Sequence, residues 1–289
     1  MIRRPPRSTL DRSSAAADVY KRQAMELASV GVKVKALVDV RSTVGTVTHR
    51  QLESIGAEVL ENSVVTRVHG RTQVHGVVVR PRSGGRARRF DCDLLCLSGG
   101  SDPRIHLTSH TGVRPVFSSA TDCFVAGDVG DAMQVVGAAS GRFDLAEAIR
   151  SGHEGGTQAV FRCGLSVTCS GEPAAMECAE SSSPAEVLWR VPEASKKAFV
   201  DLQNDVTVED VALAAREGFD SVELMKRYTT LGMATDQGKN SNTAGLAILA
   251  EETGRGMAEV GTPTIRPPNT PETVKKTQMT LPTGEIEKN

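Results

Sequence analysis

The stretch AMELASVGVKVKALVDV, residues 24–40, sets the fold class. Its first residues follow a helical pattern that we expect to end at Gly31, a typical helix stop. The next residues, VKVKALVDV at 32–40, form an apolar run that predicts a buried strand with Asp39 near its end. A helix followed directly by a buried strand is typical of α/β proteins, so we predict an α/β fold.

The alternation continues outward from this stretch. Residues 47–56 are predicted to form a helix, and three β segments after it predict a small β-meander that closes a nucleotide domain. The β segments are 58–70, 72–81 and 86–100. Beyond them, CFVAGDVGD at 123–131 predicts a short strand running into a Gly/Asp turn, and residues 135–152 predict a helix rich in small residues.

The second half of the chain has a different pattern, because a stretch rich in Ser, Pro, Ala and Glu is followed by a helical unit. Thr207 with Asp210 predicts a capping box at the first helix, and Asp220 with Glu223 predicts a similar start for the second. A third helix is predicted over 242–253. The expected segments are a partial dinucleotide-binding domain at 24–164, a linker at 165–194, a helical module at 195–260 and a disordered or truncated tail at 261–289.

Composition excludes several classes of protein. The 289 residues are 39% hydrophobic and 24% charged, which is typical of a folded protein with about two domains. The net charge of −1 argues against nucleic acid as a partner, and no apolar run reaches membrane-spanning length. The six cysteines have no paired or zinc-ligand spacing, so we expect reduced thiols, no metal site and a cytoplasmic location.

Residues 1–23, MIRRPPRSTLDRSSAAADVYKRQ, differ in character from the rest of the chain. The string resembles the conceptual translation of a sequencing-library adapter more closely than an organellar transit peptide. We therefore expect residues 1–23 to be artefactual and disordered, and the chain to be an internal fragment of a longer protein.

Two strand ends carry candidate dinucleotide-binding residues. Asp39 lies where dinucleotide folds often place an acidic residue on the adenosine ribose, although a plain strand-end carboxylate fits the pattern as well. The run FVAGD at 124–128 resembles the second nucleotide motif of flavoprotein reductases with two dinucleotide domains. There the Asp accepts hydrogen bonds from a sugar or ribityl hydroxyl; the alternative is that Asp128 only caps a helix. The candidate residues of this motif are Gly127, Asp128, Met133 and Gln134.

The helical unit resembles the bacterioferritin-associated-ferredoxin-like module, in which four cysteines bind a [2Fe–2S] cluster. The resemblance is carried by FVDLQNDVT at 199–207 and KRYTTLGMATDQGKNS at 226–241. The four ligand positions hold Asp201, Gln203, Asp236 and Ser241. Without thiolates this unit is expected to bind no iron–sulfur cluster.

Longer strings are similar to the alpha subunits of heterotetrameric sarcosine oxidase. These strings are KAFVDLQNDVT, REGFDSVELMKRYTTLGMATDQGK, EVGTPTIRPP, DLLCLSGGSDPRIHL, FVAGDVGD and VVGAASGR, and the resemblance covers about residues 24–268. It implies an NAD-bearing, reductase-like subunit that works with beta, gamma and delta subunits. Such a complex oxidises sarcosine to glycine, makes hydrogen peroxide and passes a one-carbon unit to tetrahydrofolate. We expect the fragment alone to be inactive.

The resemblance also implies FMN near the interface with the beta subunit. Cations and hydroxyls near Gly232 form a combination suited to a phosphate, and an ordinary solvated turn is the alternative. The candidate residues are Lys226, Arg227, Thr229, Thr230, Thr235, Gln237 and Lys239. Two other functions stay open: an alpha subunit of a related amino-acid dehydrogenase or opine oxidase, and a non-catalytic assembly module.

Overall fold

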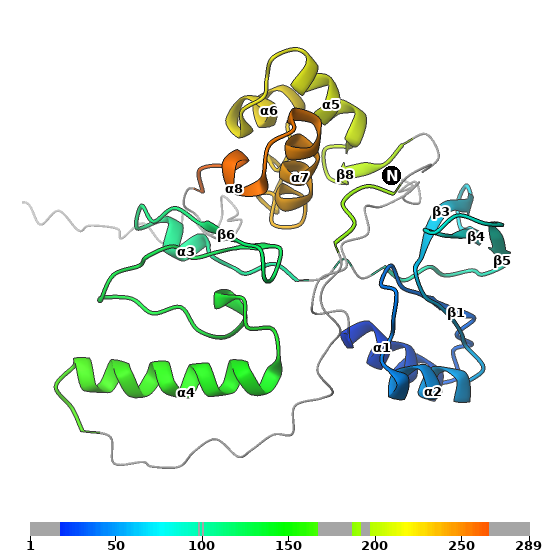
Figure 1. Cartoon of the computed structure of the whole chain (residues 1–289), viewed down its shortest axis with the longest axis horizontal. Coiled ribbons are helices and arrows are strands. Elements are labelled where there is room, and N and C mark those ends of the chain that lie inside the picture. Colours follow the sequence, from blue (N-terminus) through cyan, green and yellow to red (C-terminus); the bar gives the residue numbers. More distant parts are fainter. Residues whose placement is uncertain (1–17, 98, 100, 167–186, 192–196, 266–289) are drawn as a thin grey trace, which may run out of the picture.

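The computed structural model describes residues 18–97, 99, 101–166, 187–191 and 197–265, and Figure 1 shows how they are arranged. The first unit contains α1 (Asp18–Ser29), β1 (Ala36–Val38), α2 (Thr46–Ser54) and β2 (Glu58–Leu60). β1 and β2 pair in parallel, as a helical crossover between them requires. Leu37, Leu52 and Ala57 form the buried core of this unit.

Two expectations for this unit need correction. Residues 18–23, assigned to a disordered artefact, lie in α1; residues 1–17 fall outside the described part of the chain. The strand expected over 32–40 has only three residues, because β2, its one partner among the described strands, is equally short. Val32, in the first part of the expected strand, is 42% exposed.

An antiparallel three-stranded sheet follows, in the order β3–β4–β5. Its strands are β3 (Ser63–Gly70), β4 (Val74–Pro81) and β5 (Arg88–Phe90). The predicted β-meander is confirmed in part, because the segment expected over 58–70 is divided: β3 joins this sheet, whereas β2 pairs with β1. The last β segment is much shorter than expected, since residues 91–97 form no strand.

The middle of the chain contains α3 (His106–Ser109), the antiparallel pair β6 (Val116–Ser118) and β7 (Cys123–Val125), and α4 (Leu145–Arg162). The helix predicted over 135–152 is wrong in its first half. Gly137 and Gly141 have positive φ values of 61° and 82°, so this stretch forms only a short 3₁₀ turn. α4 begins after Asp144, whose carboxylate accepts the Glu147 N–H at 2.9 Å.

The helical module starts with a small hairpin of β8 (Phe199–Asp201) and β9 (Val206–Thr207). Its helices are α5 (Val208–Arg216), α6 (Val222–Thr229), α7 (Asn242–Thr253) and α8 (Met257–Val260). The capping box of Thr207 and Asp210 is confirmed, as are the bounds of α7. The N-cap of α6 is Ser221 and not Asp220, because the Ser221 hydroxyl accepts the N–H of Leu224 at 3.4 Å.

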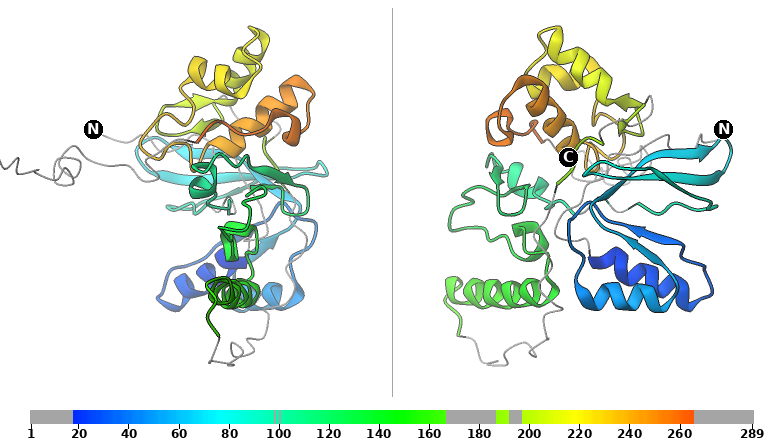
Figure 2. Two further views of the ribbon diagram at one scale, coloured as in Figure 1. Left: turned by 90° about the vertical axis from the view of Figure 1, so that its left-hand side faces the viewer. Right: turned by 45° about the vertical axis from the view of Figure 1, so that its right-hand side comes forward.

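One hydrophobic core joins the helical module to the middle of the chain. Ile105 and Phe124 lie in the same cluster of buried side chains as Val211, Met225 and Ile248. Both figures accordingly show the module resting on the segment that carries α3 and β6, and α8 contacts β6 (Figures 1 and 2). The linker expected at 165–194 therefore divides the sequence, but side chains from both sides of it pack in one core.

The expected linker and tail both contain packed residues. Leu188 and Val191 pack with Val40 and Val64 of the first units, and Trp189 packs against the core of the helical module. At the other end, Pro263 is buried and the Thr264 N–H donates to Glu223 Oε1 at 2.7 Å. Residues 167–186, 192–194 and 266–289 of these two segments lie outside the described residues, as do residues 195–196 of the expected helical module.

Among the described helices, none combines the length and the apolar character needed to span a bilayer.

The core of the module can be tested at α7. Ile248 is completely buried, so Ile248→Ala should lower the free energy of unfolding by about 2–5 kcal/mol. Leu224, 41% exposed on α6, is the matched control, and its change to Ala should cost less than about 1 kcal/mol. Urea unfolding monitored by circular dichroism measures both. Equal losses would mean that α7 is not the centre of this core.

Candidate functional site

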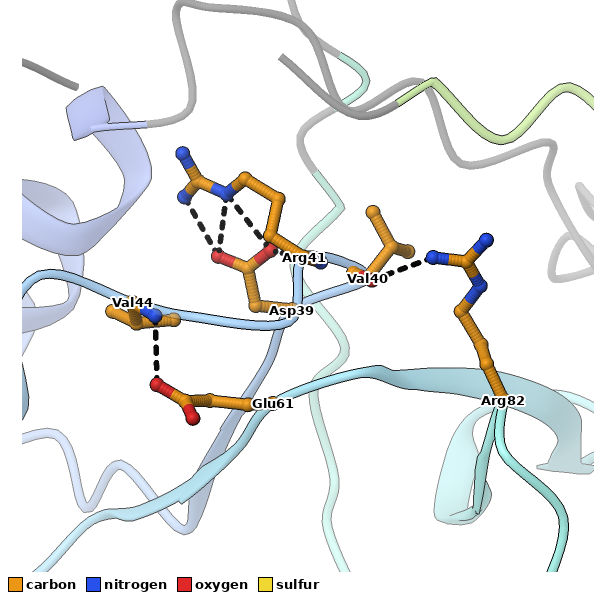
Figure 3. Close-up of polar contacts among 6 residues, drawn as sticks. All are labelled: Asp39, Val40, Arg41, Val44, Glu61 and Arg82. Carbon is orange, nitrogen blue, oxygen red and sulfur yellow. Dashed lines mark hydrogen bonds and ion pairs between the residues drawn. The ribbon is translucent and has the colours of Figure 1, made fainter. Parts of the chain in front are cut away.

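The end of β1 holds a buried ion pair between Asp39 and Arg41 (Figure 3). The Asp39 carboxylate accepts the backbone N–H of Arg41 at 2.9 Å and its Nη2 at 2.7 Å, and Arg41 Nε lies 3.1 and 3.2 Å from the two carboxylate oxygens. Arg82, directly after β4, donates Nη1 to the Val40 carbonyl at 2.8 Å. Two guanidinium groups therefore fix this strand end.

A cavity of about 830 Å³ opens beside the same strand end. Its wall is mostly apolar and combines β1 and β4 with residues 91–97. Asp39 lies on this wall, which places the predicted ribose acceptor next to a space of the size that small organic ligands occupy. To accept a ribose hydroxyl, Asp39 would have to exchange a contact with Arg41, because Arg41 occupies both carboxylate oxygens.

The Gly127–Asp128 turn follows β7, as the sequence predicted. A Cβ at Gly127 would come within 2.4 Å of the Arg114 carbonyl oxygen, so this position requires glycine. Asp128 is exposed, and its Oδ1 accepts the N–H of Gly130 at 2.9 Å. An exposed carboxylate at a tight turn fits the role of a hydroxyl acceptor.

The helix expected directly after this turn is absent at that place. α4 starts at Leu145, and its first turn is already capped by the Asp144 side chain. Met133 and Gln134 lie in the extended connection, where Gln134 Nε2 donates to Gln158 Oε1 of α4. The part of the motif that would direct a helix N-terminus at a pyrophosphate is therefore not formed by residues 135–144.

Asp201 organises the loops of the helical module. Its side chain is almost completely buried, and Oδ1 accepts the N–H of Gln203 at 2.8 Å and that of Asn204 at 3.4 Å. Oδ2 accepts the N–H of Gly232 at 2.9 Å, which ties the hairpin to a loop 31 residues later in the chain. A carboxylate thus holds these two loops together.

The other three positions of the resemblance lie around the same loops. Thr235 Oγ1 donates to Gln203 Oε1 at 2.9 Å, and Asp236 Oδ1 accepts the N–H of Gly238 at 3.0 Å. Asn242 fills the space between the loop glycines, because a Cβ at Gly232 or Gly238 would come within 2.3 or 2.2 Å of its Oδ1. Polar side chains therefore fill the space between these loops.

These residues do not fit an iron–sulfur cluster. The cluster needs thiolates, and the positions offer two carboxylates, an amide and a hydroxyl. Asp201 is already engaged with three backbone N–H groups. Among the residues that the structure describes, no group of three or more His, Cys, Asp and Glu side chains is arranged to hold a metal ion.

The predicted phosphate-binding residues have separate surroundings. Lys226 is half-buried on α6, where burial lowers its pKa while the charge of Glu223 raises it. Lys239 precedes α7, donates to Gln237 Oε1 at 3.1 Å and lies near His106. Arg227 is exposed on α6. The structure thus places the cations on two elements with different neighbours.

The hydroxyl residues of this set serve mainly local structure. Thr229 Oγ1 donates to the Met225 carbonyl at 2.8 Å and accepts the N–H of Leu231 at 3.2 Å. Thr230 ends α6 in the left-handed conformation, and its carbonyl accepts Asn204 Nδ2 at 2.8 Å. Only Thr235 and Gln237 contact other polar side chains of the loop, at 2.9 Å to Gln203 and 3.1 Å to Lys239.

Three informative residues were not predicted from the sequence. Arg41 follows Asp39 by two residues, so the sequence could have predicted an ion pair at the strand end. Asn242 and His106 gave no local signal, because their surroundings come from segments far apart in the chain.

Comparisons with known proteins identify relatives of this arrangement. Residues 195–278 match the sequence model of the sarcosine oxidase A3 domain. Over 252 residues the chain is 40% identical to sarcosine oxidase subunit alpha of Rhizobium meliloti (strain 1021), covering 86% of this chain and 24% of that protein. Over 254 residues it is 34% identical to the subunit of the same name from Corynebacterium sp. (strain P-1), with coverages of 82% and 26%.

The chain is a homologue of sarcosine oxidase alpha subunits. This confirms the resemblance drawn from the sequence. The chain spans about a quarter of the length of these relatives.

A solved structure shows the same fold. The crystal structure of L-proline dehydrogenase from P. horikoshii has a TM-score of 0.62, with 21% sequence identity, and the match covers 87% of this chain and 52% of that one. The predicted α/β class is therefore confirmed for this sarcosine oxidase alpha homologue.

The role of Asp201 in this homologue can be measured directly. Asp201→Ala should lower the free energy of unfolding by about 1–3 kcal/mol, because it leaves buried backbone N–H groups without an acceptor. Asp201→Asn, which keeps one acceptor oxygen, should lose less. Glu251→Ala, at an exposed position of α7, should change little and serves as control. Equal stability of the Asp201→Ala and Glu251→Ala variants would show that the carboxylate does not hold the loops.

The contact of Glu223 with Thr264 predicts a pH dependence. The Thr264 N–H is the main cause that lowers the pKa of Glu223 below 4.5, and the charges of Lys226 and Arg227 lower it further. A lowered carboxyl pKa stabilises the fold at neutral pH, and this contribution is lost as the pH falls below 4.5 through the folded-state value. The stability difference between the unmodified protein and Glu223→Gln should therefore be present at pH 7 and shrink as the pH falls below 4.5. A difference independent of pH in urea unfolding would contradict this.

Proposed function

We propose that this chain is the NAD-binding and scaffold part of an alpha subunit in a sarcosine oxidase complex. The observation that carries the proposal is the 34–40% identity to two such subunits over more than four-fifths of the chain. In that complex sarcosine is oxidised to glycine, oxygen is reduced to hydrogen peroxide, and a one-carbon unit passes to tetrahydrofolate. The proposal includes beta, gamma and delta partner subunits and a cytoplasmic location.

Within the proposal, two carboxylates accept hydroxyls of the nucleotide. Asp128 accepts a sugar hydroxyl at the exposed turn after β7, and Gly127 allows the close backbone approach at this turn. Asp39, beside the cavity at the end of β1, accepts a ribose hydroxyl in exchange for part of its contact with Arg41. The reductase-like architecture of two dinucleotide domains, of which this chain holds a part, is proposed on the same basis.

The helical module is proposed as a ferredoxin-like unit without a cluster. Its loops are closed by the hydrogen bonds of Asp201, and no thiolate stands at the four positions. The FMN at the interface with the beta subunit is assigned to the face that carries Lys226, Arg227 and Lys239, with the hydroxyls and amide near Gly232.

A second function is favoured by the fold. The likeness to L-proline dehydrogenase, with a TM-score of 0.62, supports the alternative of an alpha subunit from an amino-acid dehydrogenase or opine oxidase. A non-catalytic assembly module is the third possibility. The absence of thiolates at the four positions of the helical module argues against the second alternative. The third alternative differs in content, because such a module retains no nucleotide.

A chimera tests these alternatives. Residues 24–265 of this chain would replace the matching region of the Rhizobium meliloti alpha subunit, which is co-expressed with its partner subunits. We expect assembly, bound NAD and FMN, no added iron, and NAD affinity about tenfold weaker in the Asp128→Ala variant, because one hydrogen bond to the nucleotide is lost. Asp131→Ala, also exposed in the loop after β7, is the matched control.

Each other outcome selects an alternative. Acid-labile sulfide and iron in the complex would contradict the expectation that the helical module binds no cluster. A folded complex without nucleotide would favour the assembly module. Unchanged NAD affinity in the Asp128→Ala variant would leave Asp128 as a turn residue only.

A further inference from the structure

The outer edge of β1 has no strand beside it in the described part of the chain, because β1 pairs only with β2. Two bonds to β2 are made by the Lys35 carbonyl, at 3.1 Å, and by the Asp39 N–H, at 2.9 Å. In a parallel pair, alternate residues turn their peptide groups toward opposite edges. The peptide groups of Ala36 and Val38 therefore point away from β2, toward the outer edge.

A second apolar segment lines the cavity beside β1. The wall of this cavity of about 830 Å³ includes every residue of 32–40 and of 91–97. The second range contains LLCL at 94–97, a composition typical of a buried strand. This run forms no strand, and Leu94 and Leu97 are 62% and 47% exposed. Two segments that suit the inside of a sheet thus border one space.

We propose that this cavity is a slot for one β-strand from the part of the longer homologues that this chain does not cover. The strand slot is defined by residues 34–38 on one side and residues 94–97 on the other. The chain matches only 24% and 26% of the two alpha subunits, so most of their length lies outside the matched region. The proposal rests on this homology and not on the binding of NAD.

The slot also sets the chemistry of its occupant. Its wall includes Leu27 of α1 and Val77 and Val79 of β4, and it is mostly apolar. Strands of parallel sheets are buried on both faces and are therefore apolar at nearly every position. A strand beside β1 would bond to the peptide groups of Ala36 and Val38, as peptides do when they add to an open sheet edge. The expected occupant is an apolar segment of about five or six residues.

A small apolar molecule fits this cavity less well than a strand does. It would cover the apolar wall but leave the peptide groups of Ala36 and Val38 shielded from water without hydrogen bonds, which is costly. A parallel sheet of two strands is also incomplete, because such sheets are found with both faces covered inside α/β folds. A third strand removes both defects.

A peptide array made from a homologue tests the slot. Overlapping peptides of about 12 residues, twice the usual strand length, would cover the Rhizobium meliloti alpha subunit outside the matched region. The array is probed with the full chain, and the strongest peptide is then labelled and titrated by fluorescence anisotropy. We expect binding to peptides with a continuous apolar run. N-methylation of alternate peptide nitrogens should weaken it about tenfold or more, because it removes N–H donors at nearly constant apolar area.

A variant of the chain tests the same bonds from the other side. Ala36→Pro removes an N–H that faces the slot and is not used in pairing with β2, and proline is tolerated at the first residue of a strand. Peptide affinity should fall about tenfold. Ala36→Ser, which keeps the N–H, is the matched control and should bind as the unmodified chain does.

Thiol alkylation shows where the peptide binds. Cys96 is exposed on the wall of the slot, whereas Cys163 is exposed at the end of α4 and lies outside it. Bound peptide should slow alkylation of Cys96 by iodoacetamide and leave the rate at Cys163 unchanged, as measured by mass spectrometry. If circular dichroism shows that Ala36→Pro is unfolded, the N-methylated peptides and the Cys96 rate decide the test.

Three results would overturn the proposal. The first is an array without bound peptides. The second is peptide binding that N-methylation does not weaken or that leaves the Cys96 rate unchanged, which would reduce the cavity to a pocket for small apolar molecules or place the peptide elsewhere. The third is self-association of the chain, seen by sedimentation, that Ala36→Pro abolishes and Ala36→Ser does not. In that case a second copy fills the slot.

Discussion

Helix α7 has no polar face along its centre, and the C-terminal half of the chain is arranged to bury it. All seven residues from Ala244 to Ala250 are buried. A helix that is apolar on every side is stable only inside a core. Ile105 and Phe124 of the preceding segment belong to the same cluster of buried side chains. The core that buries α7 therefore also joins the helical module to the middle of the chain.

The loops at the ends of this core are held by polar side chains. α7 begins directly after the loop that contains Gly232 and Gly238, and Asn242 fills the space between these glycines. Asp201 binds the same loop through Gly232, and it is the most buried acidic side chain of the module. A carboxylate with three N–H donors is a compact link between two loops, and it needs no metal to be stable. The apolar helix and the polar loop are thus two parts of one packing arrangement.

Local signals were sufficient for some elements and not for others. The capping box at Thr207 and the limits of α7 were predictable because cap residues and apolar runs act over a few residues. The helix expected over 135–152 was wrong because Gly137 and Gly141 adopt positive φ values, a choice that composition does not reveal. Asp39 and Asp128 were located at strand ends, but the contacts of Asp39 with Arg41 and of Asp201 with Gly232 depend on the folded arrangement.

The short segment 187–191 packs with two separate hydrophobic clusters. Its side chains alternate between two cores, since Leu188 and Val191 pack with Val40 and Val64 while Trp189 packs on the helical module. Arg190 adds an ion pair to Glu252 on α7 at 2.9 Å. Residues 187–191 thus contact both the helical module and the part of the chain that contains Val40 and Val64. A covalent connection raises the effective concentration of one part for the other, to about millimolar for short flexible connections. Contacts between them that would dissociate in separate molecules can therefore persist within this one.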